Sequence, residues 1–213
     1  MNQQRFDGKI VLVTGGGSGI GRATALRFAH EGAAEVFVLD RRPERADKVA
    51  KEISDAGGNG VPIVGDIGNT VGCDKAVQTV VEKAGGLDIM VSNAAAWTQE
   101  SFLEMKEESW DCVLNVILKA SFLLGQRAAR AMKDRGGGVI LYTASIAASG
   151  GVRHFVHYNV GKAGILAMMQ TMALELAPMK IRVNAVSPGP SDTQQSVDIC
   201  GEEVMKEFRK SFD

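Results

Sequence analysis

A tyrosine and a lysine four positions apart are the first residues in this sequence whose types and spacing suggest chemistry. Residues 158–162 read YNVGK, and positions i and i+4 share one face of a helix, so the Lys162 ammonium would lie beside the Tyr158 phenol. The pKa of a free phenol is about 10, and lowering it to about 7 takes roughly 4 kcal/mol of preferential phenolate stabilisation. An adjacent cation acts in that direction, so the pair favours a tyrosine acid/base, although the same spacing also occurs in purely structural helices.

Ser145 could complete such a site. It follows the apolar run at residues 138–143 and precedes Tyr158 by 13 residues. A serine hydroxyl at the end of a strand can donate a hydrogen bond to a carbonyl or alkoxide oxygen. Together the three side chains indicate proton transfer to or from a substrate oxygen.

A glycine-rich turn near the N-terminus is the second candidate. Residues 14–21 read TGGGSGIG and lie between an apolar run and a helical pattern. Glycines at the start of a helix let backbone N–H groups close on a pyrophosphate, and the helix dipole favours the negative charge. The spacing of Gly15, Gly19 and Gly21 departs from the G-x-G-x-x-G fingerprint, so a purely structural turn is an alternative.

Asp40 stands 19 residues after Gly21, at the end of the second apolar run. It could simply be a polar strand end. A carboxylate about 20 residues after such a turn can also accept hydrogen bonds from an adenosine ribose, and it would repel the 2′-phosphate of NADP. Arg41 and Arg42 follow at once and could instead pair with that phosphate. NAD is therefore favoured and NADP stays open.

Short apolar runs alternate with helix-length segments along the whole chain. The runs are continuously apolar, as strands covered on both faces should be. This alternation predicts one α/β domain over residues 1–213, with a doubly wound, Rossmann-type parallel sheet and helices on both faces. Ligands of such folds bind beyond the carboxyl ends of the strands. The expected strands are 9–14, 35–40, 61–64, 87–92, 138–143 and 181–186. The expected helices are 19–31, 43–56, 70–85, 107–135, 157–177 and 201–211.

Composition argues against several classes of function. The 24 Lys and Arg residues balance 25 Asp and Glu residues, so no dominant basic field favours nucleic acid or an anionic membrane. No run of about 18 apolar residues is found, which predicts no membrane span. Cys73, Cys112 and Cys200 have no zinc or redox spacing, and the polar N-terminus has no signal-peptide character. We expect a cytoplasmic protein without a catalytic metal.

The order and spacing of these motifs resemble the short-chain dehydrogenase/reductase family, in its short single-domain branch, over nearly the whole chain. The resemblance implies that Tyr158 is the catalytic acid/base and that Lys162 binds the nicotinamide ribose and lowers the tyrosine pKa. It implies that Ser145 binds the substrate oxygen. Asn115, in WDCVLNV, matches the helix asparagine that holds a water in the family's proton relay.

The resemblance also implies a set of cofactor contacts. The glycine-rich turn would hold the pyrophosphate, and residues after the later strands would hold the adenine and the nicotinamide carboxamide. The implied contacts are Gly15, Ser18, Gly19, Ile20, Gly21, Asp40, Arg41, Asp66, Ile67, Asn93, Ala94, Tyr158, Lys162, Pro188, Gly189 and Thr193.

The sequence departs from the family pattern in three places. Ser92 and Ala95 replace the usual Asn and Gly of the turn after the fourth strand, and Ser191 replaces a common aliphatic residue. The third departure is larger, because family members usually continue with another helix and a seventh, C-terminal strand that is absent from this sequence. We therefore expect the sixth strand to be an exposed sheet edge.

The substrate pocket is less well defined by the sequence. Trp97, after the fourth strand, and Phe155, shortly before Tyr158, are candidates for its wall together with Ser145. His154 and His157 flank Phe155 and could either line the mouth of the pocket or be solvated loop histidines.

The leading hypothesis is an NAD(P)-dependent oxidoreductase that interconverts a secondary alcohol and a ketone by hydride transfer, with Tyr158 as acid/base. The alternative is a catalytically silent dinucleotide-binding or regulatory protein on the same fold. The helices expected at 107–135 and 157–177 are apolar on more than one face. This predicts burial against a second copy, and hence a homodimer at least, with a tetramer left open.

Overall fold

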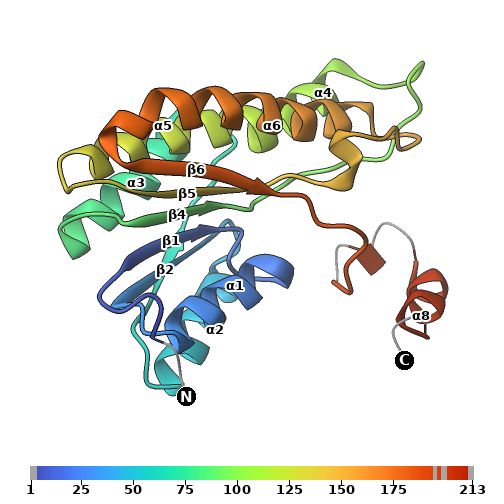
Figure 1. Ribbon diagram of the computed structural model, residues 1–213. Coiled ribbons are helices and arrows are strands. Elements are labelled where there is room, and N and C mark those ends of the chain that lie inside the picture. Colours follow the sequence, from blue (N-terminus) through green and yellow to red (C-terminus); the bar gives the residue numbers. More distant parts are fainter. Residues whose placement is uncertain (1–3, 194–195, 198–200, 211–213) are drawn as a thin grey trace.

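Six parallel strands form one sheet in the order β3-β2-β1-β4-β5-β6, with helices on both of its faces (Figure 1). The computed structural model describes residues 4–193, 196–197 and 201–210. The doubly wound, Rossmann-type fold expected from the sequence is confirmed, and β2, β5 and β6 have the expected bounds. The strands are β1 (Ile10–Thr14), β2 (Glu35–Asp40), β3 (Gly60–Val64), β4 (Ile89–Ser92), β5 (Gly138–Thr143) and β6 (Ile181–Val186).

The helices begin and end within two residues of their expected positions, and local signals explain several of these boundaries. Pro43 begins α2, where its missing N–H costs nothing. Asn69 caps α3 by accepting a hydrogen bond from the backbone N–H of Gly72 at 2.8 Å, and Gly85 ends that helix with a φ of 73°. The α-helices are α1 (Gly19–His30), α2 (Pro43–Asp55), α3 (Thr70–Ala84), α4 (Glu107–Leu114), α5 (Ala120–Lys133), α6 (Val156–Leu176) and α8 (Glu202–Lys210).

The apolar character of the strands follows from burial on both sides. Val11 and Val13 of β1 pack in the cluster that includes side chains of α1 and α2. Leu12, between them, belongs to the other cluster, with Phe37 of β2 and Ile140 of β5, beneath α3, α5 and α6. Because successive residues of a strand point to opposite faces, a strand covered twice has no polar face.

One continuous helix, Glu107–Lys133, is formed by α4, a π-helical segment η1 (Asn115–Lys119) and α5. By length and composition it could cross a membrane, and the expectation that the chain has no membrane span stays a prediction. The side chains of Ile117, Leu124 and Met132 are fully buried in the core cluster under this helix. A core helix of a soluble protein can be equally long and apolar. The burial of these side chains in the core explains why this helix is apolar.

The strand order reverses between β1 and β4, because the chain leaves β3 at one edge of the sheet and returns through α3 to the other side of β1. The loops after β1 and β4 therefore diverge at this point and leave a crevice at the carboxyl ends of the strands. In the part of the chain that the structure describes, β6 pairs with β5 alone and is an edge strand, as β3 is at the other side of the sheet.

Candidate active site

The glycine-rich turn packs directly against the segment that follows β4. Gly15 has a φ of 62°, and a Cβ at this position would lie 2.8 Å from the Cα of Ala94. A Cβ on Gly21 would lie 2.1 Å from the carbonyl oxygen of Gly15. Neither position has room for a side chain, so the first and last glycines of the motif let the turn fold back onto the start of α1.

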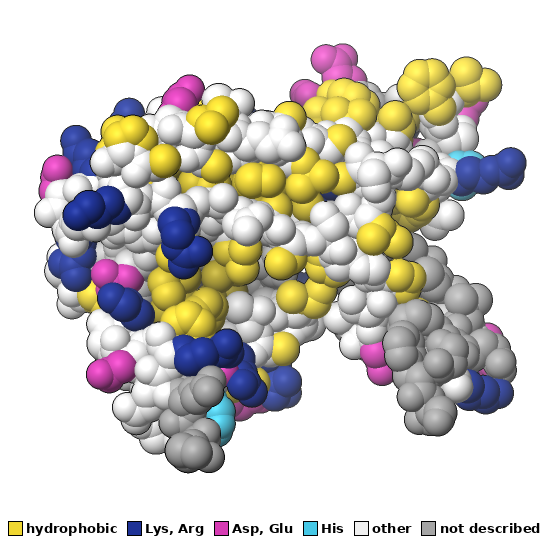
Figure 2. Space-filling view, viewed as in Figure 1, with side chains coloured by type: hydrophobic (Ala, Val, Ile, Leu, Met, Phe, Trp, Pro, Cys, Tyr) yellow, Lys and Arg dark blue, Asp and Glu magenta, His cyan; other side chains and the backbone are white. Residues whose placement is uncertain are grey.

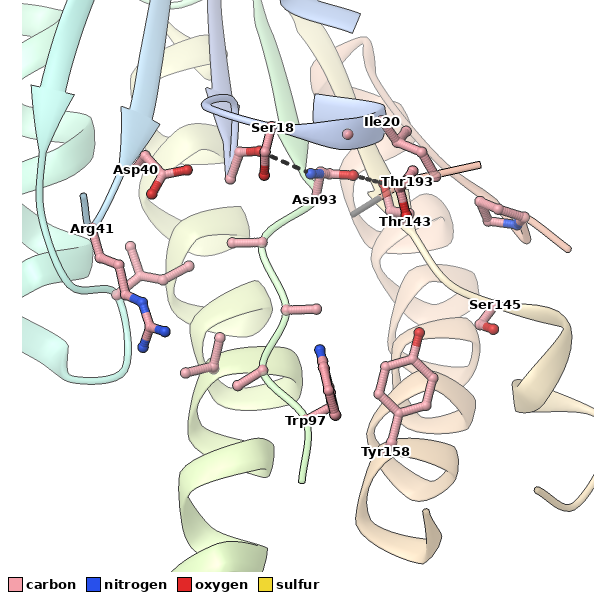
Figure 3. Close-up of a pocket in the computed structure, with 18 of the residues that line it drawn as sticks. Ser18, Ile20, Asp40, Arg41, Asn93, Trp97, Thr143, Ser145, Tyr158 and Thr193 are labelled. Carbon is pink, nitrogen blue, oxygen red and sulfur yellow. Dashed lines mark hydrogen bonds between the residues drawn. The ribbon is translucent and has the colours of Figure 1, made fainter. Parts of the chain in front are cut away.

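Asn93 joins this turn to β5 across the crevice (Figure 3). Its backbone N–H donates to Thr14 Oγ1 at 3.0 Å, and its Nδ2 donates to the carbonyl oxygen of Gly15 at 3.3 Å. Its Oδ1 accepts from Thr143 Oγ1, also at 3.3 Å. One amide side chain therefore fixes the ends of three neighbouring strands relative to one another.

Asp40 closes the other side of the turn at the end of β2. It is 8% exposed, Oδ2 accepts from the backbone N–H of Gly17 at 3.2 Å and Oδ1 accepts from that of Arg42 at 3.1 Å. Backbone donors thus hold the carboxylate in place while lone pairs remain to accept from a ribose hydroxyl. Arg45 donates from Nη1 to Ser18 Oγ at 3.3 Å, which brings a guanidinium to the same end of the site.

A cavity of about 540 Å³ runs from this turn to the helix that carries Tyr158 (Figure 3). Ligand sites typically enclose about 300–1,000 Å³, so its size suits a bound small molecule. Ser145, Tyr158, Lys162 and Trp97 line one part of it. These residues surround one cavity, and the cofactor and substrate contacts assigned to them stay predictions. The predicted cofactor residues that line it are Gly15, Ser18, Gly19, Ile20, Asp40, Arg41, Asp66, Ile67, Asn93, Ala94, Tyr158, Lys162, Pro188, Gly189 and Thr193.

Tyr158, Ser145 and Lys162 come together where β5 and α6 border the cavity. The Tyr158 phenol points toward the part of the cavity that Ser145 borders (Figure 3). Ala147 supports Ser145 by donating its backbone N–H to Oγ at 3.2 Å. One turn further along α6, Lys162 donates from Nζ to the carbonyl oxygen of Thr143 at 2.6 Å, and Nζ lies 5.6 Å from the centroid of the Tyr158 ring.

Burial controls the titration of these groups. It lowers the pKa of the buried Lys162 amine to about 8 and raises the pKa of Tyr158, while the nearby Ser145 hydroxyl opposes that rise. Lys162, which the sequence led us to expect to lower the tyrosine pKa, is not among the causes that act on it. The Lys162 amine donates instead to the Thr143 carbonyl oxygen. Tyr158 therefore holds its proton at neutral pH, as a general acid for ketone reduction must.

Two predicted contact residues lie behind the cavity wall. Gly21 is buried beneath the turn and supports it from within. Phe155 is also buried and packs between Trp97 and Tyr158, with ring centroids 6.4 Å from each. Phe155 thus supports the aromatic wall from behind, and its direct contact with substrate stays a prediction.

Asn115 is the third predicted residue outside the cavity lining. It begins the π-helical segment η1 and is half-buried. The residue of this helix that faces α6 next to Lys162 is Ile117, because a Cβ on Gly161 would lie 2.9 Å from its Cγ2. The role of Asn115 in a proton relay stays a prediction.

Several other residues that line the cavity were not among the site residues assigned from the sequence. Arg42 was considered only as a possible phosphate partner, and Arg45 follows one turn later on α2, a position that helical spacing could have revealed. Thr143 acts through its carbonyl oxygen, which leaves no signal in residue type. The other such residues are Leu39, Gly65, Ala95, Ala96, Cys112, Val116, Ala144, Ser191 and Ser196.

The two histidines that flank Phe155 have different surroundings. His154 is exposed and has a φ of 66°. His157 is fully buried, so its interpretation as a solvated loop histidine is wrong. Neither residue lines the cavity.

Among the described residues, no group of three His, Cys, Asp or Glu side chains could hold a metal ion. That a metal plays no part in catalysis stays a prediction. Cys73 and Cys112 are free thiols, and burial raises the pKa of Cys73 to about 11, whereas Cys200 lies outside the described residues.

The chemistry of the cavity wall fits a dinucleotide along its length. The backbone N–H groups and dipole at the start of α1 suit a pyrophosphate, and the glycine positions leave room for it to approach the backbone. Asp40 suits a ribose at one end. Lys162 and Tyr158 stand at the other end, where the reacting ring would lie.

Comparisons with known proteins agree with this arrangement. Residues 9–202 match the family described as short chain dehydrogenase. Over 189 residues the chain is 39% identical to 3-oxoacyl-(acyl-carrier-protein) reductase FabG of Thermotoga maritima, covering 89% of this chain and 76% of that protein.

Solved structures show the same fold. A 7α-hydroxysteroid dehydrogenase complexed with NADH and 7-oxo glycochenodeoxycholic acid has a TM-score of 0.91 at 30% identity, covering 97% of this chain and 80% of its own. A short chain dehydrogenase from Burkholderia cenocepacia in complex with NADP has a TM-score of 0.83 at 36% identity, covering 89% of this chain and 77% of its own.

Proposed function

This chain belongs to the short-chain dehydrogenase/reductase family, and from that premise we propose that it interconverts a secondary alcohol and a ketone with Tyr158 as acid/base. As a member of the family it is an NAD(P)-dependent oxidoreductase. One observation above all supports the finer statement. The Tyr158 phenol points toward the part of the cavity that Ser145 borders, and Lys162 follows one helical turn later (Figure 3).

The residues divide the proton chemistry between them. In ketone reduction, Ser145 donates a hydrogen bond to the carbonyl oxygen and Tyr158 delivers its proton to that oxygen as negative charge develops there. In alcohol oxidation, the Tyr158 phenolate accepts the hydroxyl proton. The bound nicotinamide supplies or receives the hydride, and its cationic form adds a nearby positive charge that favours the phenolate. Lys162 would hold the nicotinamide ribose.

NAD is the cofactor that we propose as the preferred one. The support is Asp40, whose carboxylate is held at the end of β2 by two backbone N–H groups. Arg41, Arg42 and Arg45 line the same end and would attract a 2′-phosphate. The proposal is that the fixed carboxylate outweighs the three arginines, since its charge lies where the ribose hydroxyls would lie.

A spectrophotometric screen tests the function. NAD and NADP would each be offered with a panel of ketones, sugars, sterols and acyl thioesters, and the absorbance of the reduced nicotinamide followed. Turnover of a substrate in the panel supports the proposal. Tight cofactor binding without turnover across the panel would favour a silent dinucleotide-binding protein instead.

Tyr158→Phe tests the assignment of the acid/base. The ring remains and the transferable proton is lost, so kcat should fall by roughly 100-fold to 10,000-fold while cofactor affinity is kept. Tyr142→Phe is the matched control, because the fully buried Tyr142 hydroxyl donates to the carbonyl oxygen of Ser121 at 3.1 Å, away from the cavity. Near-normal turnover of Tyr158→Phe would reject the role.

We further propose a cytoplasmic location and a small-molecule substrate. The location is supported by the free thiols of Cys73 and Cys112, which suit a reducing compartment. Fractionation of the native host cell tests it.

A further inference from the structure

One buried imidazole fastens the Trp97 loop, residues 93–106 between β4 and α4, to the first turn of α6. His157 is 0% exposed. Its Nδ1 accepts a hydrogen bond from the backbone N–H of Tyr158 at 2.9 Å, and its Nε2 lies 2.7 Å from Thr98 Oγ1. The side chain thus bridges the helix turn that carries the acid/base and a loop 59 positions earlier in the chain.

These two contacts decide which ring nitrogen carries the proton. The Tyr158 N–H is a donor, so Nδ1 must be unprotonated, and the neutral imidazole then donates from Nε2 to Thr98 Oγ1. Burial lowers the pKa of His157, while the Phe155 carbonyl and the Glu100 carboxylate favour the charged form more weakly. The His157 ring is therefore uncharged at neutral pH, and each of its two nitrogens makes one hydrogen bond.

Beyond Asn93 and Ala94 at its start, which are hydrogen-bonded to the ends of neighbouring strands, the Trp97 loop has few other attachments of this kind. The backbone N–H of Glu100 donates to the carbonyl oxygen of His154 at 3.1 Å, and the Trp97 ring packs on Phe155. Phe102 and Leu103, the large apolar residues at the tip of the loop, are 76% and 88% exposed and contribute little packing. A loop without a core of its own depends on the few buried polar contacts at its base.

We infer that His157 is a positioning residue, which ties the Trp97 loop to α6 and so sets the distance between Trp97 and the Tyr158 phenol. The inference rests on the proposed function, because that function makes Trp97 and Tyr158 two sides of the substrate space. His157 touches neither substrate nor cofactor. It acts through its hydrogen bonds to Thr98 and to the backbone of Tyr158. In this way it sets how closely a substrate ring or chain fits between Trp97 and Tyr158.

Fluorescence quenching of Trp97 tests the loop contact without cofactor or substrate. The chain has two tryptophans, so a Trp110→Phe background makes Trp97 the only emitter. Thr98→Val removes the hydroxyl and keeps the shape of the side chain, whereas Thr98→Ser keeps the hydroxyl. Loss of one buried hydrogen bond should shift the balance between the attached and open loop roughly threefold to tenfold. Acrylamide quenching should therefore increase in Thr98→Val and stay unchanged in Thr98→Ser.

Variants of the histidine complete the comparison. His157→Leu should increase quenching as Thr98→Val does, and adding Thr98→Val to it should cause little further change, because both remove the same contact. His154→Asn is the control, since it removes an exposed imidazole three residues away and asparagine tolerates the positive φ at that position. Equal quenching in the unmodified background, Thr98→Val and His157→Leu would overturn the inference.

The ring itself can be observed by ¹⁵N NMR of histidine, since the sequence has three histidines and His157→Leu identifies the signal. We expect a neutral ring protonated on Nε2, with a pKa below that of an exposed histidine. A ring protonated on Nδ1, or one that titrates as a solvated imidazole, would overturn the assignment.

Kinetics separates this inference from the proposed function. With a substrate from the screen, Thr98→Val should raise the substrate KM by roughly threefold to tenfold and leave the cofactor Kd unchanged, because only the substrate wall is loosened. Unchanged KM in a variant with increased quenching would overturn the positioning role. If no substrate is turned over, the proposed function fails, while the quenching and NMR results still decide whether the contact exists.

Discussion

At the scale of single residues, Lys162 shows how burial sets the charge of a side chain. The amine is almost fully buried, donates to the Thr143 carbonyl oxygen, and has a pKa of about 8 instead of 10.5. A neighbouring carbonyl offsets part of the cost of burying an ammonium, and desolvation is the larger effect. The spacing of Tyr158 and Lys162 could be recognised in the sequence, but this balance depends on β5 and α6 meeting in three dimensions.

The lowered pKa of Lys162 leads to a prediction about how the free energy of unfolding depends on pH. Between pH 8 and 10.5 the unfolded chain holds a proton on Lys162 that the folded chain has released, so the contribution of this group to stability rises with pH across that window. Lys162→Met removes the titrating group, and the variant should lose that part of the rise. Urea unfolding of both proteins at pH 8 and at about pH 10 measures it. Parallel pH dependence in the two proteins would contradict the shifted pKa.

Asp40 carries a second prediction at this scale. Asp40→Ala should weaken NAD binding by about 1–3 kcal/mol, the value of a hydrogen bond to a charged group, and should relatively favour NADP. Fluorescence titration with both cofactors measures the change. Arg41→Ala is the matched variant, because it should reduce NADP affinity and leave NAD affinity nearly unchanged. If the unmodified protein binds NADP more tightly than NAD, the arginines set the preference and the proposed choice of cofactor is wrong.

At the scale of elements, the packing of the helix Glu107–Lys133 against α6 decides which residues of that helix lie near the site. Apolar periodicity predicted the helix at 107–135 to within two residues, but residue type carries no sign of the π-helical segment at Asn115–Lys119. The order of residues in WDCVLNV suggested Asn115 for the relay, and that role stays a prediction. In the structure, Ile117 and Leu118 of this segment pack on the glycines of α6. Side-chain direction within an irregular turn requires the structure.

Two variants of this helix test separate roles. If Asn115 holds a water in a proton relay, as the family resemblance implies, Asn115→Ala should lower kcat and keep cofactor affinity. Ile117→Ala should lower the free energy of unfolding by about 2–4 kcal/mol, because it leaves a hole in a fully buried contact. Steady-state kinetics and urea unfolding measure the two effects. An unchanged kcat in Asn115→Ala would reject the relay role.

At the scale of the whole molecule, the reversal of strand order at β1 and β4 explains why the predicted residues meet. The sequence predicted all six strands, and the rule that ligands bind at their carboxyl ends gathered most of the candidate residues around one cavity. The Trp97 loop could not be placed in this way. The contact between Thr98 and His157 joins an irregular loop to a helix 59 positions later in the chain. The periodicity of apolar residues in a sequence gives no sign of such a contact.

The outer surface of α6 leads to a prediction about assembly. Four of its 21 residues are buried, namely His157, Gly161, Lys162 and Ile165, although the helix is apolar nearly all round. Figure 2 shows hydrophobic side chains on the surface of this part of the molecule. The segment 160–177 has two charged residues, Lys162 and Glu175. A second copy of the same face, brought up through a two-fold axis, would bury these apolar side chains without burying unpaired charges.

Light scattering at micromolar concentration measures this association. The unmodified protein should have at least twice the chain mass of 22.6 kDa. Leu174, on α6, is 79% exposed, and Leu174→Glu would place a desolvated carboxylate in the interface, so the variant should shift toward the monomer. Leu103→Glu changes a similarly exposed leucine in the Trp97 loop, which contacts the opposite end of α6 from Leu174, and should leave the mass unchanged. A clean 22.6 kDa species for the unmodified protein would reject the dimer, and the apolar face of α6 would then be exposed to solvent in the free protein.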